Sequence, residues 1–238
     1  MIKLFKQILI KISKGIYYLI PAEFQIRSSK RILKNEVDKL IAQETISHFY
    51  EHFKKSTIIN EPWKLRKYAI ENSLSNDKDK QYFYLELGTY KGETANFFSK
   101  FLNKLYCFDS FEGLREDWLG TGASKGTFNL NKKIPRLNSN IECVVGWVED
   151  TLEEFLKRKS PKINFVHVDL DNYSSVKFSL EKLKPYLVKN SIILFDEYYN
   201  YTGWERGEYK AFKEIFSDNE FQYKAFNLES KQCVIQII

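Results

Sequence analysis

The stretch YFYLELGTYKGETA, residues 82–95, carries the clearest structural signal in the chain. Its first six residues are a short apolar run, which is typical of a strand buried on both faces of a sheet. Gly88 ends this run, and Gly92 stands at the start of a segment with helical character. Because a strand, a glycine turn and a helix in this order form the first half of a βαβ unit, the stretch predicts a parallel sheet.

The same alternation continues toward the C-terminus. Further strands are expected at residues 104–109, 141–145, 163–169 and 191–196, with helices near 92–103, 150–159, 173–187 and 206–217. The last two apolar runs, 221–226 and 233–238, are too close together for a crossover, so they predict an antiparallel hairpin. The sequence therefore predicts an α/β fold with a doubly wound, Rossmann-like sheet of seven strands, mostly parallel. Residues 110–139, which are rich in glycine, are expected to be irregular.

The N-terminal part has a different character. Residues 1–60 predict a helical appendage, and residues 61–238 form the sheet domain, whose first helix begins at Pro62. Wound at about 100° per residue, residues 2–17 place apolar side chains on one face and lysines on the other. Two interpretations follow: packing on the protein's own domain or on a second copy in a homo-oligomer such as a dimer, and peripheral contact of residues 1–20 with the inner face of a membrane.

Composition limits the function classes. The 238 residues are 43% hydrophobic and 29% charged, which excludes a wholly disordered chain. The formal charge of +6 tolerates an anionic ligand, but the basic patches with interleaved aromatics of RNA-binding sheets are absent, so no nucleic acid partner is expected. No uncharged apolar run reaches the ~18 residues of a membrane span. Three widely spaced cysteines predict no disulfide framework and favour a reducing, cytoplasmic compartment.

Ligands of doubly wound sheets bind beyond the carboxyl ends of the strands. At the end of the first predicted strand the spacing is E-x-G-x-x-x-G, from Glu86 through Gly88 to Gly92, and not the G-x-G-x-x-G of nicotinamide sites. A carboxylate there disfavours a pyrophosphate and suits a cationic group, such as the sulfonium of S-adenosylmethionine. Asp109 ends the second strand, where a carboxylate suits the hydroxyls of a ribose. The alternative is that both glycines only make a tight turn.

Carboxylates also follow the fourth and fifth predicted strands. Asp169 and Asp171 end one, and Asp196 and Glu197 end the other. Because these strands should be neighbours, their acids should converge, and like charges held together need protons or a cation. With oxygen ligands alone, Mg²⁺ or a similar divalent ion is favoured over zinc. The alternative is that these acids cap the helices that follow, which suits Asp171 best.

Two further features lie beside these acids. His167 shares a strand face with Asp169, and it is either a buried, hydrogen-bonded histidine or a catalytic base. Aromatic residues follow the second acidic pair directly, namely Tyr198, Tyr199, Tyr201 and Trp204. They predict a substrate wall for a sugar or a ring, with ordinary packing against the N-terminal helices as the alternative.

Together these stretches resemble the class I S-adenosylmethionine-dependent methyltransferases and, more narrowly, the macrocin O-methyltransferase family. The matching segments are LELGTYKGETA (85–95), CFDSFEGL (107–114), GWVEDTL (146–152), HVDLDNYSS (167–175) and FDEYYNYTGW (195–204). The resemblance covers about residues 80–217. It implies an O-methyltransferase that acts on a hydroxyl of a sugar, natural product or glycan, with S-adenosylmethionine as cofactor and a divalent cation.

The resemblance also implies roles for individual residues. The implied cofactor set is Glu86, Gly88, Thr89 and Gly92 at the methionine end, Asp109 and Ser110 at the ribose, and Val148 and Glu149 beside the adenine. The implied metal ligands are Asp169, Asp196 and Glu197, and the catalytic candidates are Asp169, Asp171 and His167. The chain departs from the family at Glu197 and Tyr199, where Asp-Asp-Tyr is more common, which leaves the substrate open. The alternative function is a non-catalytic partner subunit of the same fold, although such a chain would be expected to lose the charged residues that this one keeps.

Overall fold

The computed structural model describes residue 12 and residues 22–238. The chain divides into two compact units, residues 1–47 and residues 48–238. The division falls within helix α2 (Ala22–Phe53), whereas the predicted boundary lies after residue 60. The amphipathic helix expected over residues 2–17 lies outside the described residues, with the exception of residue 12. Within the described part, no helix is both long and apolar enough to cross a bilayer.

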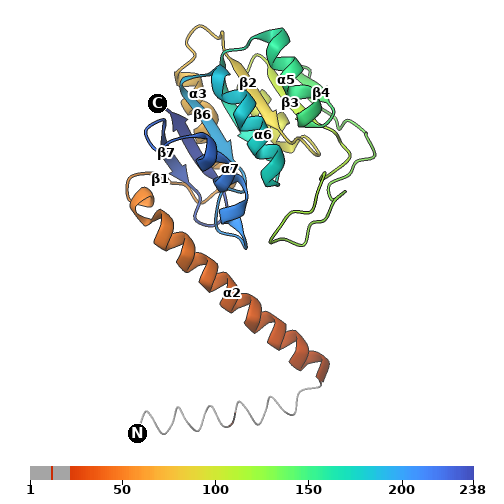
Figure 1. Cartoon of the computed structure of the whole chain (residues 1–238), viewed down its shortest axis with the longest axis vertical. Helices are drawn as coiled ribbons and strands as arrows, with labels where there is room; N and C mark the ends of the chain where they lie inside the picture. Colours follow the sequence, from red (N-terminus) through yellow and green to blue (C-terminus); the bar gives the residue numbers. More distant parts are fainter. Residues whose placement is uncertain (1–11, 13–21) are drawn as a thin grey trace. The chain divides into compact units, whose positions relative to one another are not determined.

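The second unit is built on one mixed sheet (Figure 1). The strand order is β1-β7-β8-β6-β5-β2-β3-β4. The strands are β1 (Thr57–Ile58), β2 (Phe83–Leu87), β3 (Leu105–Asp109), β4 (Ile141–Val145), β5 (Ile163–Val168), β6 (Leu187–Phe195), β7 (Phe221–Phe226) and β8 (Cys233–Ile237). Strands β2 to β6 pair in parallel, and β8 runs antiparallel to both β6 and β7, which confirms the predicted Rossmann-like sheet and its C-terminal hairpin.

The predicted number of seven strands is wrong by one. The eighth strand, β1, has only two residues and pairs in parallel with β7, with Thr57 opposite Ala225. Two residues are too few to show the alternation that identifies a strand in a sequence. This strand exists because a partner more than a hundred positions away in the chain supplies its hydrogen bonds.

Helices cover both faces of the sheet. Helices α5 (Val148–Lys159), α6 (Tyr173–Leu183) and α7 (Glu208–Ile215) lie side by side on one face, and α3 (Pro62–Ser75) lies on the other beside α4 (Glu93–Ser99) (Figure 1). Short 3₁₀ helices stand at Lys184–Tyr186 and Trp204–Arg206. Between α3, α4 and the sheet lies an apolar core that includes Leu65, Ile70, Phe98 and Phe165. Every residue of β5 is buried, as expected of a central parallel strand.

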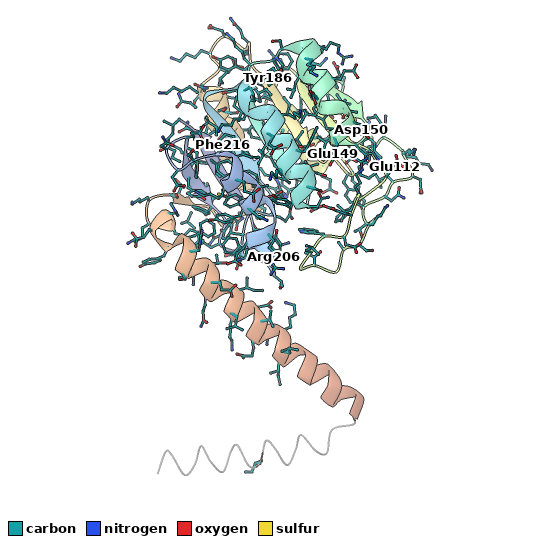
Figure 2. All side chains as sticks on the ribbon, in the orientation of Figure 1. Glu112, Glu149, Asp150, Tyr186, Arg206 and Phe216 are labelled. Carbon is teal, nitrogen blue, oxygen red and sulfur yellow. The ribbon has the colours of Figure 1, made fainter. Side chains whose placement is uncertain are left out.

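Caps define where the helices begin. Glu61 caps α3, since its carboxylate accepts hydrogen bonds from the backbone nitrogens of Trp63 and Lys64. Asn172 caps α6 by accepting a 3.0 Å bond from the nitrogen of Ser175, so the capping role considered for Asp171 belongs to its neighbour. Acidic residues in the first turn of α5, Glu149 and Asp150, complement the helix dipole (Figure 2). Because Asn172 caps α6, the carboxylate of the preceding Asp171 is not used as a cap of that helix.

Candidate functional site

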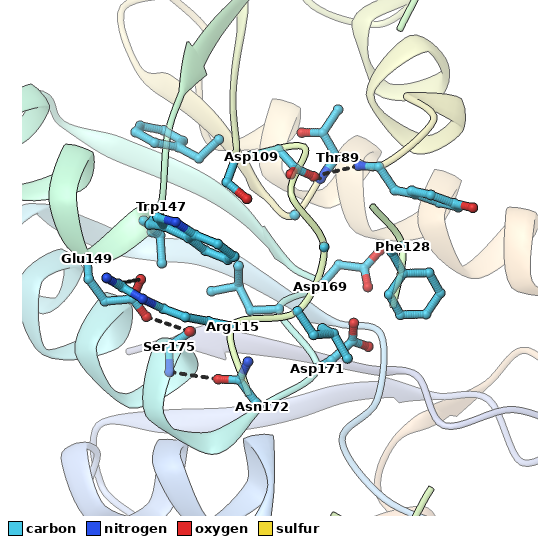
Figure 3. Close-up of a pocket in the computed structure, with 18 of the residues that line it drawn as sticks. Thr89, Asp109, Arg115, Phe128, Trp147, Glu149, Asp169, Asp171, Asn172 and Ser175 are labelled. Atoms are coloured by element: carbon cyan, nitrogen blue, oxygen red, sulfur yellow. Dashed lines mark hydrogen bonds and ion pairs between the residues drawn. The ribbon is translucent and has the colours of Figure 1, made fainter. Parts of the chain in front are cut away.

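A cavity of about 290 Å³ lies at the carboxyl ends of β2, β3, β4 and β5 (Figure 3). The loops that follow these strands supply most of its lining, and Glu197 reaches it from the end of β6. Predicted site residues in the lining are Gly88, Thr89, Asp109, Ser110, Val148, Glu149, Asp169, Asp171 and Glu197. The topology thus brings together residues from four of the five matching sequence segments and one residue of the last.

Gly88 makes the close approach of two strand ends possible. Its φ is +84°, and a Cβ on this residue would lie 1.8 Å from the carbonyl oxygen of Asp169. Only glycine fits a position with both restrictions. Gly92, with a φ of +76°, opens α4 and is not among the residues that line the cavity.

The carboxylate of Asp109 organises the loop after β2. One oxygen accepts hydrogen bonds from the backbone nitrogens of Thr89 and Tyr90, at 2.8 and 2.7 Å, and the other accepts a 2.6 Å bond from the nitrogen of Phe111. Three such bonds leave about one of the four acceptor positions of a carboxylate free. Asp109 therefore fastens the glycine loop to the end of β3, and its binding to a ribose stays a prediction.

The ring of Trp147, just before α5, forms one wall of the cavity. The guanidinium of Arg115 lies 5.2 Å from the ring centroid of Trp147 and binds the carboxylate of Glu149 at 3.0 Å (Figure 3). The second oxygen of Glu149 accepts a 2.5 Å bond from the hydroxyl of Ser175. A flat ring with hydrogen-bonding groups at its edge is chemically suited to an adenine, whose position beside Val148 and Glu149 stays a prediction.

Three lining residues, Arg115, Trp118 and Phe128, lie outside all the matching sequence segments and were not predicted. All three come from the irregular stretch between β3 and β4, which has no hydrophobic periodicity to interpret. The only available signal was compositional, because bulky and cationic side chains recur there among glycines. The stretch is irregular as predicted, and it forms one wall of the cavity.

Three carboxylates meet on the opposite side of the cavity. Asp169, Asp171 and Glu197 each offer an oxygen, and these oxygens all lie within 4.8 Å of one another. Burial raises the pKa of Asp169 and of Glu197 well above the ordinary range, and the charge of Asp196 raises both further. Burial, followed by the same charge, raises the pKa of Asp171 to about 7. One oxygen of Glu197 is buried with no hydrogen-bond partner among the described residues. The group is thus suited to a proton or a hard cation.

Asp196, the third predicted metal ligand, is held elsewhere. Its Oδ1 accepts bonds from the guanidinium of Arg66 at 2.6 Å and from the amide of Gln232 at 2.5 Å. Burial alone would raise the pKa of Asp196, but its contact with His167 and the charge of Arg66 outweigh burial and lower it. The observed cluster therefore differs from the predicted set in one member, with Asp171 in place of Asp196.

His167 is completely buried between two carboxylates. Its Nδ1 lies 3.0 Å from Oε1 of Glu86, and its Nε2 lies 3.5 Å from Oδ1 of Asp196. Burial alone would lower the pKa of His167, but these two hydrogen bonds raise it to about 9. Neither His167 nor Glu86 lines the cavity, so the geometry favours the buried, hydrogen-bonded histidine over the catalytic base.

The aromatic segment after Glu197 is packed inside the protein. Tyr198, Tyr199, Tyr201 and Trp204 are all buried, and none of them lines the cavity. Phe49 of α2 packs against the rings of Tyr198, Tyr199 and Trp204. The Tyr199 hydroxyl donates a 2.7 Å bond to the carbonyl of Asn227. These contacts correspond to the packing alternative and not to a substrate wall of this cavity.

Comparison with known proteins agrees with the geometry. Residues 85–198 match a family model described as a methyltransferase domain. The structure is similar to that of CalS11, a calicheamicin methyltransferase, with a TM-score of 0.60, 18% identity, and 91% of this chain and 94% of that chain covered. It is also similar to apo CalS11, described as a TDP-rhamnose 3'-O-methyltransferase (TM-score 0.53, 17% identity, 91% and 96% covered). The O-methyltransferase NovP matches with a TM-score of 0.56, 14% identity, and 74% and 78% covered. No curated protein matches the chain significantly in sequence.

Proposed function

We propose that this chain transfers the methyl group of S-adenosylmethionine to a hydroxyl of a sugar, natural product or glycan, with the help of a divalent cation. Its class I methyltransferase fold and the match of residues 85–198 to a methyltransferase domain support the proposal. The observation that carries the proposal is the composition of one cavity. Its lining includes both the glycine loop with Asp109 and the cluster of Asp169, Asp171 and Glu197. Donor and acceptor chemistry would thus meet in a single pocket.

The residues present fit S-adenosylmethionine. Gly88 and Thr89 line the cavity at the end of β2, and the Trp147 ring offers it an apolar face from the loop after β4. A sulfonium is a cation, and the cavity has an excess of acidic over basic lining residues. Because a sulfonium methyl is already activated, the protein's task is to align the acceptor oxygen with it and to exclude water.

The residues also fit a hard divalent ion such as Mg²⁺. Among the described residues, one buried oxygen of Glu197 has no hydrogen-bond partner, and the Glu197 carboxylate clusters with two further carboxylates; both observations support this fit. Asp169 and Glu197, which belong both to the predicted set and to the observed cluster, would hold the ion. If bound there, a divalent ion would lower the pKa of a hydroxyl that coordinates it.

We assign to Asp171 the role of the general base, which accepts the proton of the acceptor's hydroxyl. It lies in the cavity beside the other two acids, and its backbone has a left-handed φ of 63°. An aspartate in this conformation costs energy, and such strain is concentrated at functional sites. His167 is the other candidate for this role, but both of its ring nitrogens already contact carboxylates, those of Glu86 and Asp196.

The test separates binding from catalysis. Isothermal titration calorimetry with S-adenosylmethionine measures cofactor binding, and transfer of a labelled methyl group to a host glycan and metabolite extract, with and without EDTA, measures activity. Binding together with EDTA-sensitive transfer is the expected result. Binding without any transfer would favour the non-catalytic partner subunit, and absence of binding would contradict the proposed methyl transfer. Asp79→Ala, which changes an exposed loop carboxylate, is the matched control for every aspartate variant.

A further inference from the structure

A second cavity of about 240 Å³ adjoins the first one. It is lined by Pro62, Arg66, Asp196, Glu197, Ser230, Lys231 and Gln232. Glu197 lines both cavities, so they meet at the acid cluster. A molecule seated in the second cavity would therefore lie next to the carboxylates at which the proposed methyl transfer takes place.

The ammonium of Lys231 is held in place by aromatic rings. Its Nζ lies 5.0 Å from the ring centroid of Trp118 and 5.2 Å from that of Tyr201. Within residues 22–238 it makes no ion pair at 4.0 Å or less and no hydrogen bond. Two cation–π contacts orient the side chain without using its three N–H donors. Lys231 thus presents an oriented cation that has no acceptor.

Arg66 of α3 also has unused donors. Its side chain is 12% exposed and stacks on Trp63, with 4.8 Å between the guanidinium carbon and the ring centroid. One nitrogen, NH2, binds Asp196, while Nε is buried with no hydrogen-bond partner among the described residues. A guanidinium carries five N–H donors in a planar fork that matches an oxyanion.

The charges in the cavity leave room for an anion. Arg66 and His167 offset the two carboxylates that they contact, Asp196 and Glu86, so Lys231 is the further cation of the lining, beside Glu197. A neutral molecule in the cavity would desolvate Lys231 and the remaining donors of Arg66 without replacing their water. An oxyanion would restore those hydrogen bonds, and bonds between charged partners are the stronger kind.

We propose that the second cavity binds the methyl acceptor and that this acceptor carries an oxyanion, a phosphate or a carboxylate, which Lys231 and Arg66 contact. The hydroxyl to be methylated would then point past Glu197 into the first cavity. This assignment rests on the proposed function for the identity of the reaction, but the oxyanion site itself is a property of the second cavity.

The test uses simple oxyanions as probes. Calorimetric titrations of the full chain with pyrophosphate, inorganic phosphate and acetate are made in EDTA, so that no divalent ion bridges the anion to the carboxylates. We expect saturable binding, tightest for pyrophosphate if the natural group is a phosphate and for acetate if it is a carboxylate. Lys231→Gln should weaken that binding by about tenfold or more, and Lys231→Arg should retain it. Lys189→Gln, an exposed lysine on β6, is the matched control and should bind as the wild type does.

Two outcomes would overturn the proposal: no oxyanion binds, or Lys231→Gln binds as tightly as the control. The second outcome would mean that Lys231 only neutralises nearby carboxylates. S-adenosylmethionine is titrated into the same samples, with the anion present and absent. Cofactor binding without oxyanion binding refutes this inference alone, whereas oxyanion binding without cofactor binding refutes the proposed function alone.

Discussion

The side chain of Glu208 accepts a hydrogen bond from the backbone nitrogen of Glu197, with 3.1 Å between Oε2 and that nitrogen. Glu208 is completely buried at the start of α7, and its other oxygen has no partner among the described residues. Burial, reinforced by the charges of Asp169 and Asp196, raises the pKa of Glu208 well above its ordinary range. A carboxyl whose charged form is disfavoured by burial therefore holds the chain at Glu197, next to the acid cluster.

Replacing Glu208 tests this support. Glu208→Gln keeps an acceptor oxygen, so the free energy of unfolding should change by about 1 kcal/mol or less. Glu208→Leu leaves the nitrogen of Glu197 without its acceptor and should destabilise the fold by about 1–3 kcal/mol. Urea denaturation measures both values, with the exposed Glu205→Gln as control. Equal free energies of unfolding for the two variants would show that the hydrogen bond from Glu197 to Glu208 does not stabilise the fold.

Gly88 should tolerate no side chain. Gly88→Ala would place a Cβ 1.8 Å from a backbone oxygen of Asp169, and that oxygen cannot move aside as a flexible side chain would. We expect a loss of more than about 3 kcal/mol in the free energy of unfolding, or failure to fold. Gly126→Ala is the matched control, because Gly126 shares the positive φ, at +83°, but has open space around it. Its cost should be about 1 kcal/mol, and equal costs for the two variants would contradict the steric argument.

Asp109→Ala should weaken binding of S-adenosylmethionine by about ten- to a hundredfold, because a charge-assisted bond to the ribose and the order of the glycine loop are both lost. Asp109→Asn separates the two effects, since its amide oxygen can still accept one backbone hydrogen bond while the charge is gone. Calorimetry is the measurement. Cofactor affinity that is unchanged in Asp109→Ala would refute the ribose assignment.

The acid cluster should bind a divalent cation. Asp169→Asn removes one of its charges and should weaken Mg²⁺ binding by about tenfold or more, whereas cofactor affinity should stay close to that of the wild type. Asp196→Asn should also reduce methyl transfer, in line with the resemblance, but its direct effect on Mg²⁺ binding should be smaller because Asp196 is engaged by Arg66. Titration of Mg²⁺ followed by calorimetry checks both variants. Full activity in excess EDTA would show that the carboxylates have another role.

Stability should depend on pH through His167. The pKa of His167 is 6.5 as an ordinary histidine and about 9 in the folded chain, so the folded state binds the proton more tightly. Its contribution, on the order of 3 kcal/mol, is complete below pH 6.5 and is lost as the pH rises toward 9. His167→Gln should flatten the decline in melting temperature over this interval. Parallel curves for wild type and variant would contradict the assignment.

From residue 62 onward, the order of strands and helices and the residues at the strand ends could be predicted from the sequence. Both are local or nearly local properties: the apolar runs at 82–87 and 163–169 are long enough to be identified alone, and in a parallel sheet the end of each strand falls on one edge. The positions of Gly88, Asp109, Asp169 and Glu197 in one cavity follow from that rule.

Which of these groups are free to bind a ligand depends on contacts between distant segments. Arg66 and Asp196 are 130 positions apart, and no pattern in the chain shows that α3 brings its guanidinium to that carboxylate. The burial of Tyr198 against Phe49 and the two-residue strand β1 are likewise products of contacts between distant segments. Hydrophobic periodicity reports which face of an element is buried, whereas the partner of a polar side chain depends on how whole elements pack, and that information exists only in three dimensions.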